Sequence, residues 1–103
     1  MFKNRMEITR TPWGKAQTQK DLGEGISFVT TERHGGYKLD RVRNAKVPAY
    51  MRKKGGWYEE DCEWSSVALT FPELFSKEVV DLAKRTLESY FPTAYAKWEE
   101  RKG

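Results

Sequence analysis

The chain has 103 residues, of which 38% are hydrophobic and 14% are aromatic, and its formal net charge is +4. This length corresponds to one domain, and the aromatic content excludes a disordered chain because aromatic side chains bury large apolar areas. The single cysteine, Cys62, excludes an internal disulfide bond and a zinc site built from several thiolates.

The N-terminal residues carry little periodic pattern. We expect residues 1–10 to be mobile and residues 11–103 to form a single α+β domain. Within this domain, Thr11-Pro12-Trp13-Gly14 predicts a turn that anchors an indole ring. Residues 1–5 do not resemble a secretion signal, and no stretch is apolar enough to cross a bilayer. We therefore expect a cytoplasmic protein without a membrane partner.

Strand signals occupy the rest of the N-terminal half. Residues 16–22 predict a short polar edge strand, and Gly23-Glu24-Gly25 predicts a turn. The β-branched and aromatic residues of segment 26–31 predict the best-defined strand. Residues 33–36 then predict a turn that uses its two glycines, and residues 37–39 predict a third strand. The pattern is that of an antiparallel meander of two or three strands.

Helix signals follow the strands. Asp40 is a favourable N-cap for a helical turn that reaches Asn44. Residues 49–54 predict one further helical turn, which Gly55-Gly56 ends. The period then changes to that of a longer helix that begins at Glu59, since apolar residues stand at i, i+3, i+4 and i+7. These residues are Trp64, Val67, Ala68 and Phe71.

Two more helices are predicted near the C-terminus. Pro72 ends the helix that begins at Glu59, and Ser76 is a favourable N-cap for the next one. Pro92 stops that helix, and Thr93 caps a final short helix. The order of the signals predicts an α+β fold. A small antiparallel sheet of two to three strands in the N-terminal half is packed by two to three C-terminal helices.

Charge is unevenly distributed along the chain. Residues 33–57 carry eight basic residues and one acidic residue, whereas residues 58–103 carry six basic and ten acidic residues. The basic segment would attract phosphate or an acidic protein surface, or else the acidic half neutralises it within the fold. Tyr37 and Tyr50 lie among these basic residues, and Trp, Tyr and Arg are frequent at binding surfaces. The candidate binding residues are Arg41, Arg43, Arg52, Lys53, Lys54, Trp57 and Tyr58.

Few residues have catalytic potential. His34 is the only histidine, and it is either a general base beside two flexible glycines or an ordinary turn residue. Glu60 belongs to an acidic cluster at residues 59–63. This cluster either provides acid–base groups or cation ligands, or it complements a helix dipole and forms salt bridges with the basic segment. Carboxylates beside Cys62 raise its thiol pKa and oppose a nucleophilic role. The pattern predicts no metal site and no cofactor, and it favours a non-enzymatic protein without excluding an enzyme.

Several motifs lie within residues 11–75. They include Thr11-Pro12-Trp13-Gly14, His34-Gly35-Gly36, Gly56-Trp57-Tyr58-Glu59-Glu60-Asp61 and Phe71-Pro72-Glu73-Leu74-Phe75. Together they resemble a small uncharacterised domain of bacteriophages, plasmids and other mobile elements. That family has no assigned activity, so the resemblance implies no catalytic residue. It implies a mobile-element context, in which short proteins often act against host defences, as anti-CRISPR proteins do.

The sequence and the resemblance together favour one function and leave two alternatives. We expect a small protein that binds and inhibits a host defence complex, for example a CRISPR-associated complex. The first alternative is an accessory protein that binds nucleic acid through the basic segment. The second is a small hydrolase or nuclease that uses His34 and the acids of residues 59–61.

Overall fold

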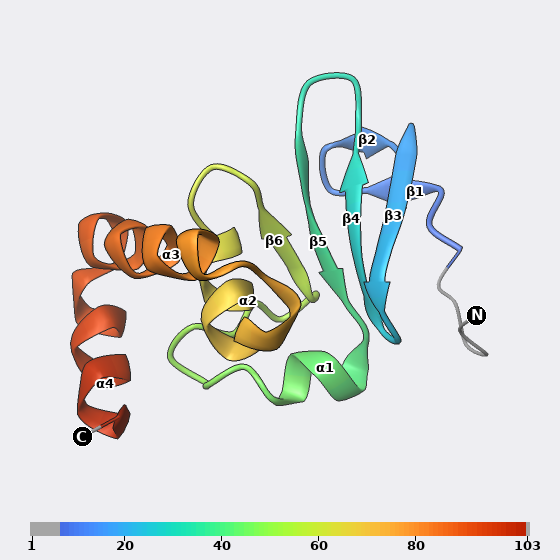
Figure 1. The fold of residues 1–103 in the computed structure, drawn as a ribbon. Coiled ribbons are helices and arrows are strands. Elements are labelled where there is room, and N and C mark those ends of the chain that lie inside the picture. The colour runs from blue at the N-terminus through green and yellow to red at the C-terminus, as the bar shows by residue number, and fades with distance from the viewer. Residues whose placement is uncertain (1–6, 103) are drawn as a thin grey trace.

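A computed structural model of the chain describes residues 7–102. Figure 1 shows a twisted sheet with helices on one side and a small hairpin near its N-terminal strand. The arrangement is α+β, as the sequence predicts. Residues 1–6 of the segment that we expected to be mobile lie outside the described residues. No helix within residues 7–102 has the length and apolar character needed to cross a bilayer.

The main sheet is a four-stranded antiparallel meander. Its strands are β3 (Thr18–Gly23), β4 (Ile26–Thr30), β5 (Gly35–Leu39) and β6 (Trp57–Glu59), and they pair in that order. The first three correspond to the strands predicted from the sequence, and the polar strand β3 lies at an edge. The sheet therefore has one strand more than expected.

Strand β6 corrects the prediction of a helix that begins at Glu59. Glu59 is the last residue of β6, a turn covers residues 60–63, and helix α2 (Trp64–Thr70) follows. Tyr58 lies directly opposite Tyr37 in the ladder with β5 and is fully buried. Tyr37 and Tyr58 are 21 positions apart in the sequence, so the strand depends on a tertiary pairing that the local helical pattern does not reveal. The acids at residues 59–61 therefore lie outside the first turn of a helix.

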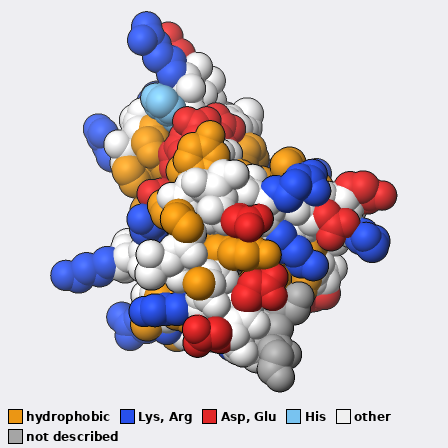
Figure 2. Space-filling view, turned by 90° about the vertical axis from the view of Figure 1, so that its left-hand side faces the viewer, with side chains coloured by type: hydrophobic (Ala, Val, Ile, Leu, Met, Phe, Trp, Pro, Cys, Tyr) orange, Lys and Arg blue, Asp and Glu red, His pale blue; other side chains and the backbone are white. Residues whose placement is uncertain are grey.

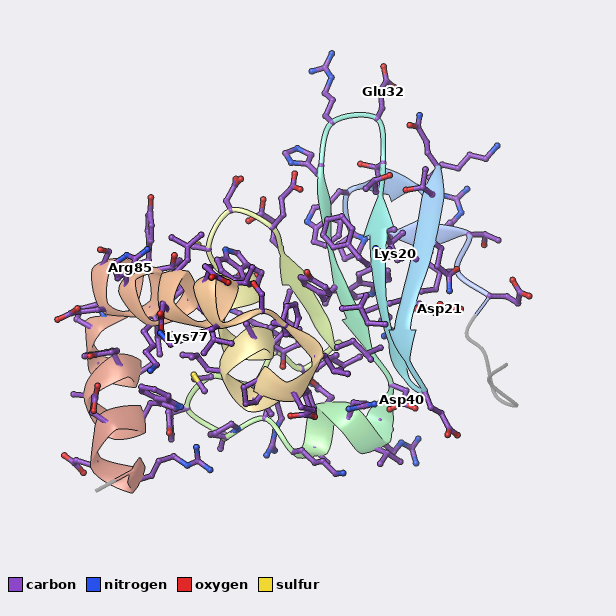
Figure 3. The ribbon with its side chains drawn as sticks, in the orientation of Figure 1. Lys20, Asp21, Glu32, Asp40, Lys77 and Arg85 are labelled. Carbon is purple, nitrogen blue, oxygen red and sulfur yellow. The ribbon has the colours of Figure 1, made fainter. Side chains whose placement is uncertain are left out.

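The glycines at residues 35 and 36 also differ from the prediction, because they belong to strand β5 and not to a turn. The turn covers Glu32 and Arg33 at the tip of the β4–β5 hairpin, where Figure 3 shows Glu32. Gly36 is buried, and a Cβ added there would lie 2.4 Å from the Trp13 ring. The position excludes a side chain because the Trp13 ring and the backbone carbonyl oxygen of Tyr58 both pack against it, so a positive φ is not the reason for the glycine.

A small hairpin covers the second face of the sheet. Its strands are β1 (Arg10–Thr11) and β2 (Gly14–Lys15), and the predicted turn at residues 11–14 places Trp13 over Gly36. The Trp13 and Trp57 rings meet edge to face, with centroids 5.4 Å apart. Val29, which pairs with Gly36, is consequently fully buried although it faces away from the helices.

The main core lies between the sheet and the C-terminal helices. After the short 3₁₀ helix η1 (Pro72–Leu74) come α3 (Lys77–Tyr90) and α4 (Pro92–Lys102). The Ser76 hydroxyl caps α3 as predicted, whereas α4 begins at Pro92 and not at the expected cap Thr93. The buried residues between these layers include Ile26, Leu39, Tyr58, Val67, Ala68, Ala83, Leu87 and Trp98.

A short helix and a long loop connect β5 to β6. Helix α1 (Arg41–Ala45) begins as predicted, since the Asp40 carboxylate accepts a hydrogen bond from the Arg43 amide at 2.8 Å. The chain then forms a hydrogen-bonded turn at residues 49–51 in place of the expected helical turn. Gly56 adopts a φ of 79° where the loop enters β6, so the glycine pair interrupts a loop and not the expected helical turn.

Candidate anion-binding cleft

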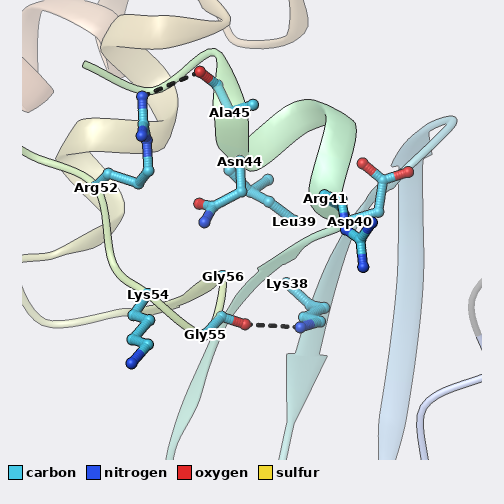
Figure 4. A pocket seen from close by; sticks show the side chains of 10 residues that line it. All are labelled: Lys38, Leu39, Asp40, Arg41, Asn44, Ala45, Arg52, Lys54, Gly55 and Gly56. Atoms are coloured by element: carbon cyan, nitrogen blue, oxygen red, sulfur yellow. Dashed lines mark hydrogen bonds between the residues drawn. The ribbon is translucent and has the colours of Figure 1, made fainter. Parts of the chain in front are cut away.

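A cleft of about 380 Å³ lies between helix α1, the end of strand β5 and the loop before β6. Figure 4 shows these three segments around an open space. Four of the side chains that line the cleft are basic, and one is acidic. The lining residues are Lys38, Leu39, Asp40, Arg41, Asn44, Ala45, Arg52, Lys54, Gly55 and Gly56.

A buried hydrogen-bond network sets the width of the cleft. The Tyr58 hydroxyl donates to the Asn44 side-chain oxygen at 2.5 Å and accepts a hydrogen bond from the Lys53 amide at 3.0 Å. The Asn44 side-chain amide in turn donates to the Lys53 carbonyl oxygen at 2.8 Å. These three bonds join α1 to the loop, two of them through the hydroxyl of the fully buried Tyr58 and one directly. The two walls of the cleft are therefore held at a fixed separation.

Two of the basic side chains cross between the walls. The Arg52 guanidinium donates to the carbonyl oxygens of Val47 and Ala45, at 2.9 and 3.1 Å. The Lys38 ammonium donates to the Gly55 carbonyl oxygen at 2.8 Å, and Figure 4 shows the bonds to Ala45 and Gly55 at opposite ends of the cleft. All these acceptors are neutral carbonyl groups, so these hydrogen bonds leave the positive charges of both side chains in place.

Arg41 and Lys54 complete the basic lining, and both side chains are exposed. Within residues 7–102, none of the four cations of the cleft forms an ion pair. Asp40, the one acid of the cleft, is engaged as the N-cap of α1. Four basic residues thus line one open cleft with a single carboxylate beside them, which is a favourable environment for an anion.

Lys38 is the most sheltered of these cations. Its ammonium lies 5.3 Å from the centroid of the Trp57 ring, in a cation–π contact. Burial lowers the pKa of Lys38 below its ordinary value, and the nearby Asp40 carboxylate offsets part of that effect. A bound anion would act in the same direction as Asp40 and favour the charged form of Lys38.

Three of the seven binding residues expected from the sequence line the cleft, namely Arg41, Arg52 and Lys54. Trp57 is half-buried against Trp13 beside the cleft. Tyr58 is fully buried, so it shapes the cleft from below and offers no surface to a partner.

The other two basic residues are used within the fold. The Arg43 guanidinium donates to the Glu24 carbonyl oxygen at 2.8 Å and lies over the Phe71 ring, 4.9 Å from its centroid. The Lys53 ammonium forms an ion pair with Glu63 at 3.2 Å. This ion pair joins the basic and acidic segments inside one molecule. It agrees, for Lys53, with the alternative in which the acidic half neutralises the basic segment within the fold.

Sequence reasoning missed Lys38 and Asn44 as lining residues. Lys38 belongs to the basic segment, and its charge was a usable signal, but its position on a predicted strand did not show that it would face the loop. Asn44 gives no such signal, because its role depends on the buried Tyr58 hydroxyl, which comes from another element.

The residues considered for catalysis lie away from the cleft. His34 is exposed and immediately precedes β5. The Glu60 amide donates to the carbonyl oxygen of the next residue, Gly35, at 2.9 Å. Burial raises the pKa of the Cys62 thiol, and the carboxylates of Glu63, Glu59 and Asp61 raise it further. Within residues 7–102, no group of three or more His, Cys, Asp and Glu side chains is arranged to hold a metal ion.

The comparisons with known proteins give a family and no function. No curated protein and no solved structure matches the chain. One family, described as a domain of unknown function (DUF7007), matches residues 6–102. This match includes the sheet, the helices and all the residues of the cleft. The chain therefore belongs to the DUF7007 family.

Proposed function

We propose that this domain is a non-enzymatic protein that binds nucleic acid, with the basic cleft as the main site for a backbone phosphate. One observation carries the proposal. Four cations line the cleft, and the two that are hydrogen-bonded across it, Lys38 and Arg52, are bonded to neutral carbonyl groups and not to carboxylates. Lys and Arg side chains that neutralise phosphates provide most of the sequence-independent affinity for nucleic acids.

The cleft also provides geometry that suits phosphate. The Arg52 guanidinium is fixed by two carbonyl groups, so its orientation is set before a ligand arrives. Arg41 and Lys54 are exposed at the rim and can close on an anion from either wall. A pre-positioned cation loses less conformational entropy on binding than a free one. The cleft therefore combines a cation that is already oriented by hydrogen bonds with two exposed cations at its rim.

The test is binding of a fluorescent oligonucleotide, measured by anisotropy between about 50 and 200 mM salt. With two or three phosphates neutralised, the logarithm of the association constant should fall with the logarithm of salt with a slope of roughly −2 to −3. The double variant Arg41→Gln, Lys54→Gln should weaken binding about tenfold or more and reduce the slope. The matched control is Lys20→Gln, Lys97→Gln, which removes the same charge from exposed positions outside the cleft. Equal losses in both variants, or no binding at about 50 mM salt, would reject the proposal.

A second candidate is the inhibition of a host defence complex, which the resemblance to mobile-element proteins implies. Exposed apolar side chains on α3 favour a protein partner, because Leu82 is 46% and Tyr90 is 65% exposed. Figure 2 shows the side of the molecule formed by α3 and α4, where apolar, basic and acidic side chains alternate without a single dominant charge.

The readout for this candidate is protection of a phage in cells that carry a defence system such as CRISPR. Expression of the domain should restore plaque formation, and the variant Leu82→Glu, Tyr90→Glu should abolish that effect. The variant Lys77→Gln, Arg85→Gln, on the same helix (Figure 3), is the control for a change of charge. Absence of protection across the tested systems would remove this candidate and leave the nucleic-acid proposal unaffected.

A further inference from the structure

Hydrogen bonds cross the basic cleft at both of its ends. At one end the Arg52 guanidinium donates to the Ala45 carbonyl oxygen, and at the other the Lys38 ammonium donates to the Gly55 carbonyl oxygen (Figure 4). Helix α1 and the loop before β6 form the walls between these two bonds. The cleft is therefore a bowl ringed by the chain, and not a channel that runs along the surface.

The shape of the bowl restricts how a strand can enter it. Its volume of about 380 Å³ is near the lower end of the range of small-ligand sites, which is about 300–1,000 Å³. A strand that continued in both directions would have to pass over both crossing bonds. The end of a strand has to enter only from the open side. The shape therefore favours a terminal group over an internal segment of backbone.

The two crossing side chains keep unused hydrogen-bond donors. A lysine ammonium has three N–H groups and an arginine guanidinium has five. The bond to Gly55 uses one N–H group of Lys38, and the bonds to Val47 and Ala45 use two of Arg52. Neither side chain makes another hydrogen bond within residues 7–102. The remaining N–H groups are therefore available to a ligand without loss of the bonds that close the cleft.

The charge of the lining exceeds that of one internal phosphate. Four basic residues and one carboxylate line the cleft, so its formal charge is +3. An internal phosphate of a nucleic-acid strand carries one negative charge. A terminal phosphate carries about 1.5 to 2 negative charges at neutral pH and has three strong acceptor oxygens. Its charge and its acceptors therefore match the lining and the unused donors better.

We propose that the basic cleft binds the terminal phosphate of a nucleic-acid strand in preference to an internal phosphate. This inference rests on the proposed nucleic-acid function and names its substrate class. The terminal phosphate occupies the bowl between Lys38 and Arg52, and the next phosphates of the strand lie beside the exposed Arg41 and Lys54. A 5′ and a 3′ phosphate share this chemistry, and the experiment distinguishes them.

The test uses three single-stranded oligonucleotides of one sequence with an internal fluorophore. One carries a 5′ phosphate, one a 3′ phosphate, and one has a hydroxyl group at both ends. At about pH 7.5, at least one phosphorylated probe should bind about tenfold more tightly than the hydroxyl probe, and the tighter one identifies the end. At about pH 5.5 this advantage should fall to about threefold, because the second pKa of a phosphate monoester is about 6.

The hydroxyl probe, measured at each pH, corrects for titration of the protein itself. The charged residues that line the cleft, from β5, α1 and the loop, are Lys38, Asp40, Arg41, Arg52 and Lys54. Their titration affects the hydroxyl and phosphorylated probes alike when it acts through the strand. The ratio of the two affinities therefore reports the charge of the terminal phosphate.

A variant of Lys38 tests whether the advantage arises in the cleft. Lys38→Gln removes the charge and keeps an N–H donor for the Gly55 carbonyl oxygen. It should reduce the advantage of the phosphorylated probe to about threefold or less. The matched control Lys20→Gln removes the same charge at an exposed position outside the cleft and should leave the advantage near tenfold. Partial unfolding of a variant lowers both affinities equally, so it does not change their ratio.

The outcomes separate this inference from the function on which it rests. Equal affinity for the three probes, an advantage that does not change with pH, or an equal loss of the advantage in both variants would overturn the preference for a terminal phosphate. The nucleic-acid proposal would still stand if Arg41→Gln, Lys54→Gln weakened binding of the hydroxyl probe. Absence of binding to every probe would overturn both proposals.

Discussion

Replacing Tyr58 with phenylalanine tests whether the buried network builds the cleft. The change removes one oxygen atom from a side chain that is fully buried and keeps the ring in place. It eliminates the bonds to the Asn44 oxygen and the Lys53 amide, which are 2.5 and 3.0 Å long. Both partners would then lack the bonds that now satisfy them inside the protein.

The expected loss of stability follows from these two bonds. Each hydrogen bond contributes about 0.5–1.5 kcal/mol net, and a buried group left without a partner costs about 1–3 kcal/mol. We expect Tyr58→Phe to lower the free energy of unfolding by about 2–3 kcal/mol. For a domain of this size, that corresponds to a fall in the melting temperature of roughly 10–20 °C. Urea unfolding at neutral pH measures the change directly.

Tyr37→Phe is the matched control. Tyr37 lies opposite Tyr58 in the ladder and packs against Phe28 and Phe75, with ring centroids 4.9 and 5.6 Å apart. These ring contacts survive the substitution, so its effect should stay within about 0.5 kcal/mol. If the two variants lose equal stability, or if Tyr58→Phe keeps the wild-type stability, the network does not hold α1 to the loop.

The pH dependence gives an independent readout. Burial raises the pKa of the Tyr58 hydroxyl above its ordinary value of 10.0. The unfolded chain therefore ionises at lower pH than the folded protein. The stability linked to this residue is complete below pH 10.0 and is lost as the pH rises from there through the raised pKa. Tyr58→Phe should remove that part of the alkaline destabilisation.

Two further predictions concern other parts of the fold. Gly36→Ala should lower the free energy of unfolding by about 1–3 kcal/mol, because the added Cβ would lie 2.4 Å from the Trp13 ring. Gly55→Ala is the control and should be nearly neutral, because the atom nearest to its added Cβ is 3.8 Å away. Thermal unfolding of the two variants checks this contrast. Cys62 should react with iodoacetamide more slowly than a free thiol near pH 8, since its pKa is raised, and Glu63→Gln should accelerate the reaction. An unchanged rate in Glu63→Gln would contradict the electrostatic contribution.

Local chemistry was sufficient to predict most of the elements. Asp40 and Ser76 cap helices because their side-chain oxygens accept hydrogen bonds from the next turn, and this depends on nearby residues only. Strand β4 was predictable from its β-branched and aromatic composition. Strand β6 was not, because its three residues become a strand only by pairing with β5, and the acidic residues after it resemble a helix start.

The site was predictable in composition and not in arrangement. The uneven charge distribution identified the basic segment, but its cations divide between internal and solvent-facing roles according to tertiary contacts. Arg43 and Arg52 have the same chemistry, yet one lies over Phe71 and the other borders the cleft. The glycines at residues 35 and 36 show the same limit, since a need for small size beside Trp13 looks like a turn signal in the sequence.

The division of the basic residues is itself an argument for an anionic partner. Lys53 is neutralised by Glu63, whereas the four cations that line the cleft have a single carboxylate, that of Asp40, among them. Like charges that gather in one place repel, so the unliganded protein is less stable than it would be with these cations dispersed. A phosphate bound between them removes that repulsion and stabilises the folded state through its binding energy. The stabilisation should be largest at low salt, where the repulsion is least screened.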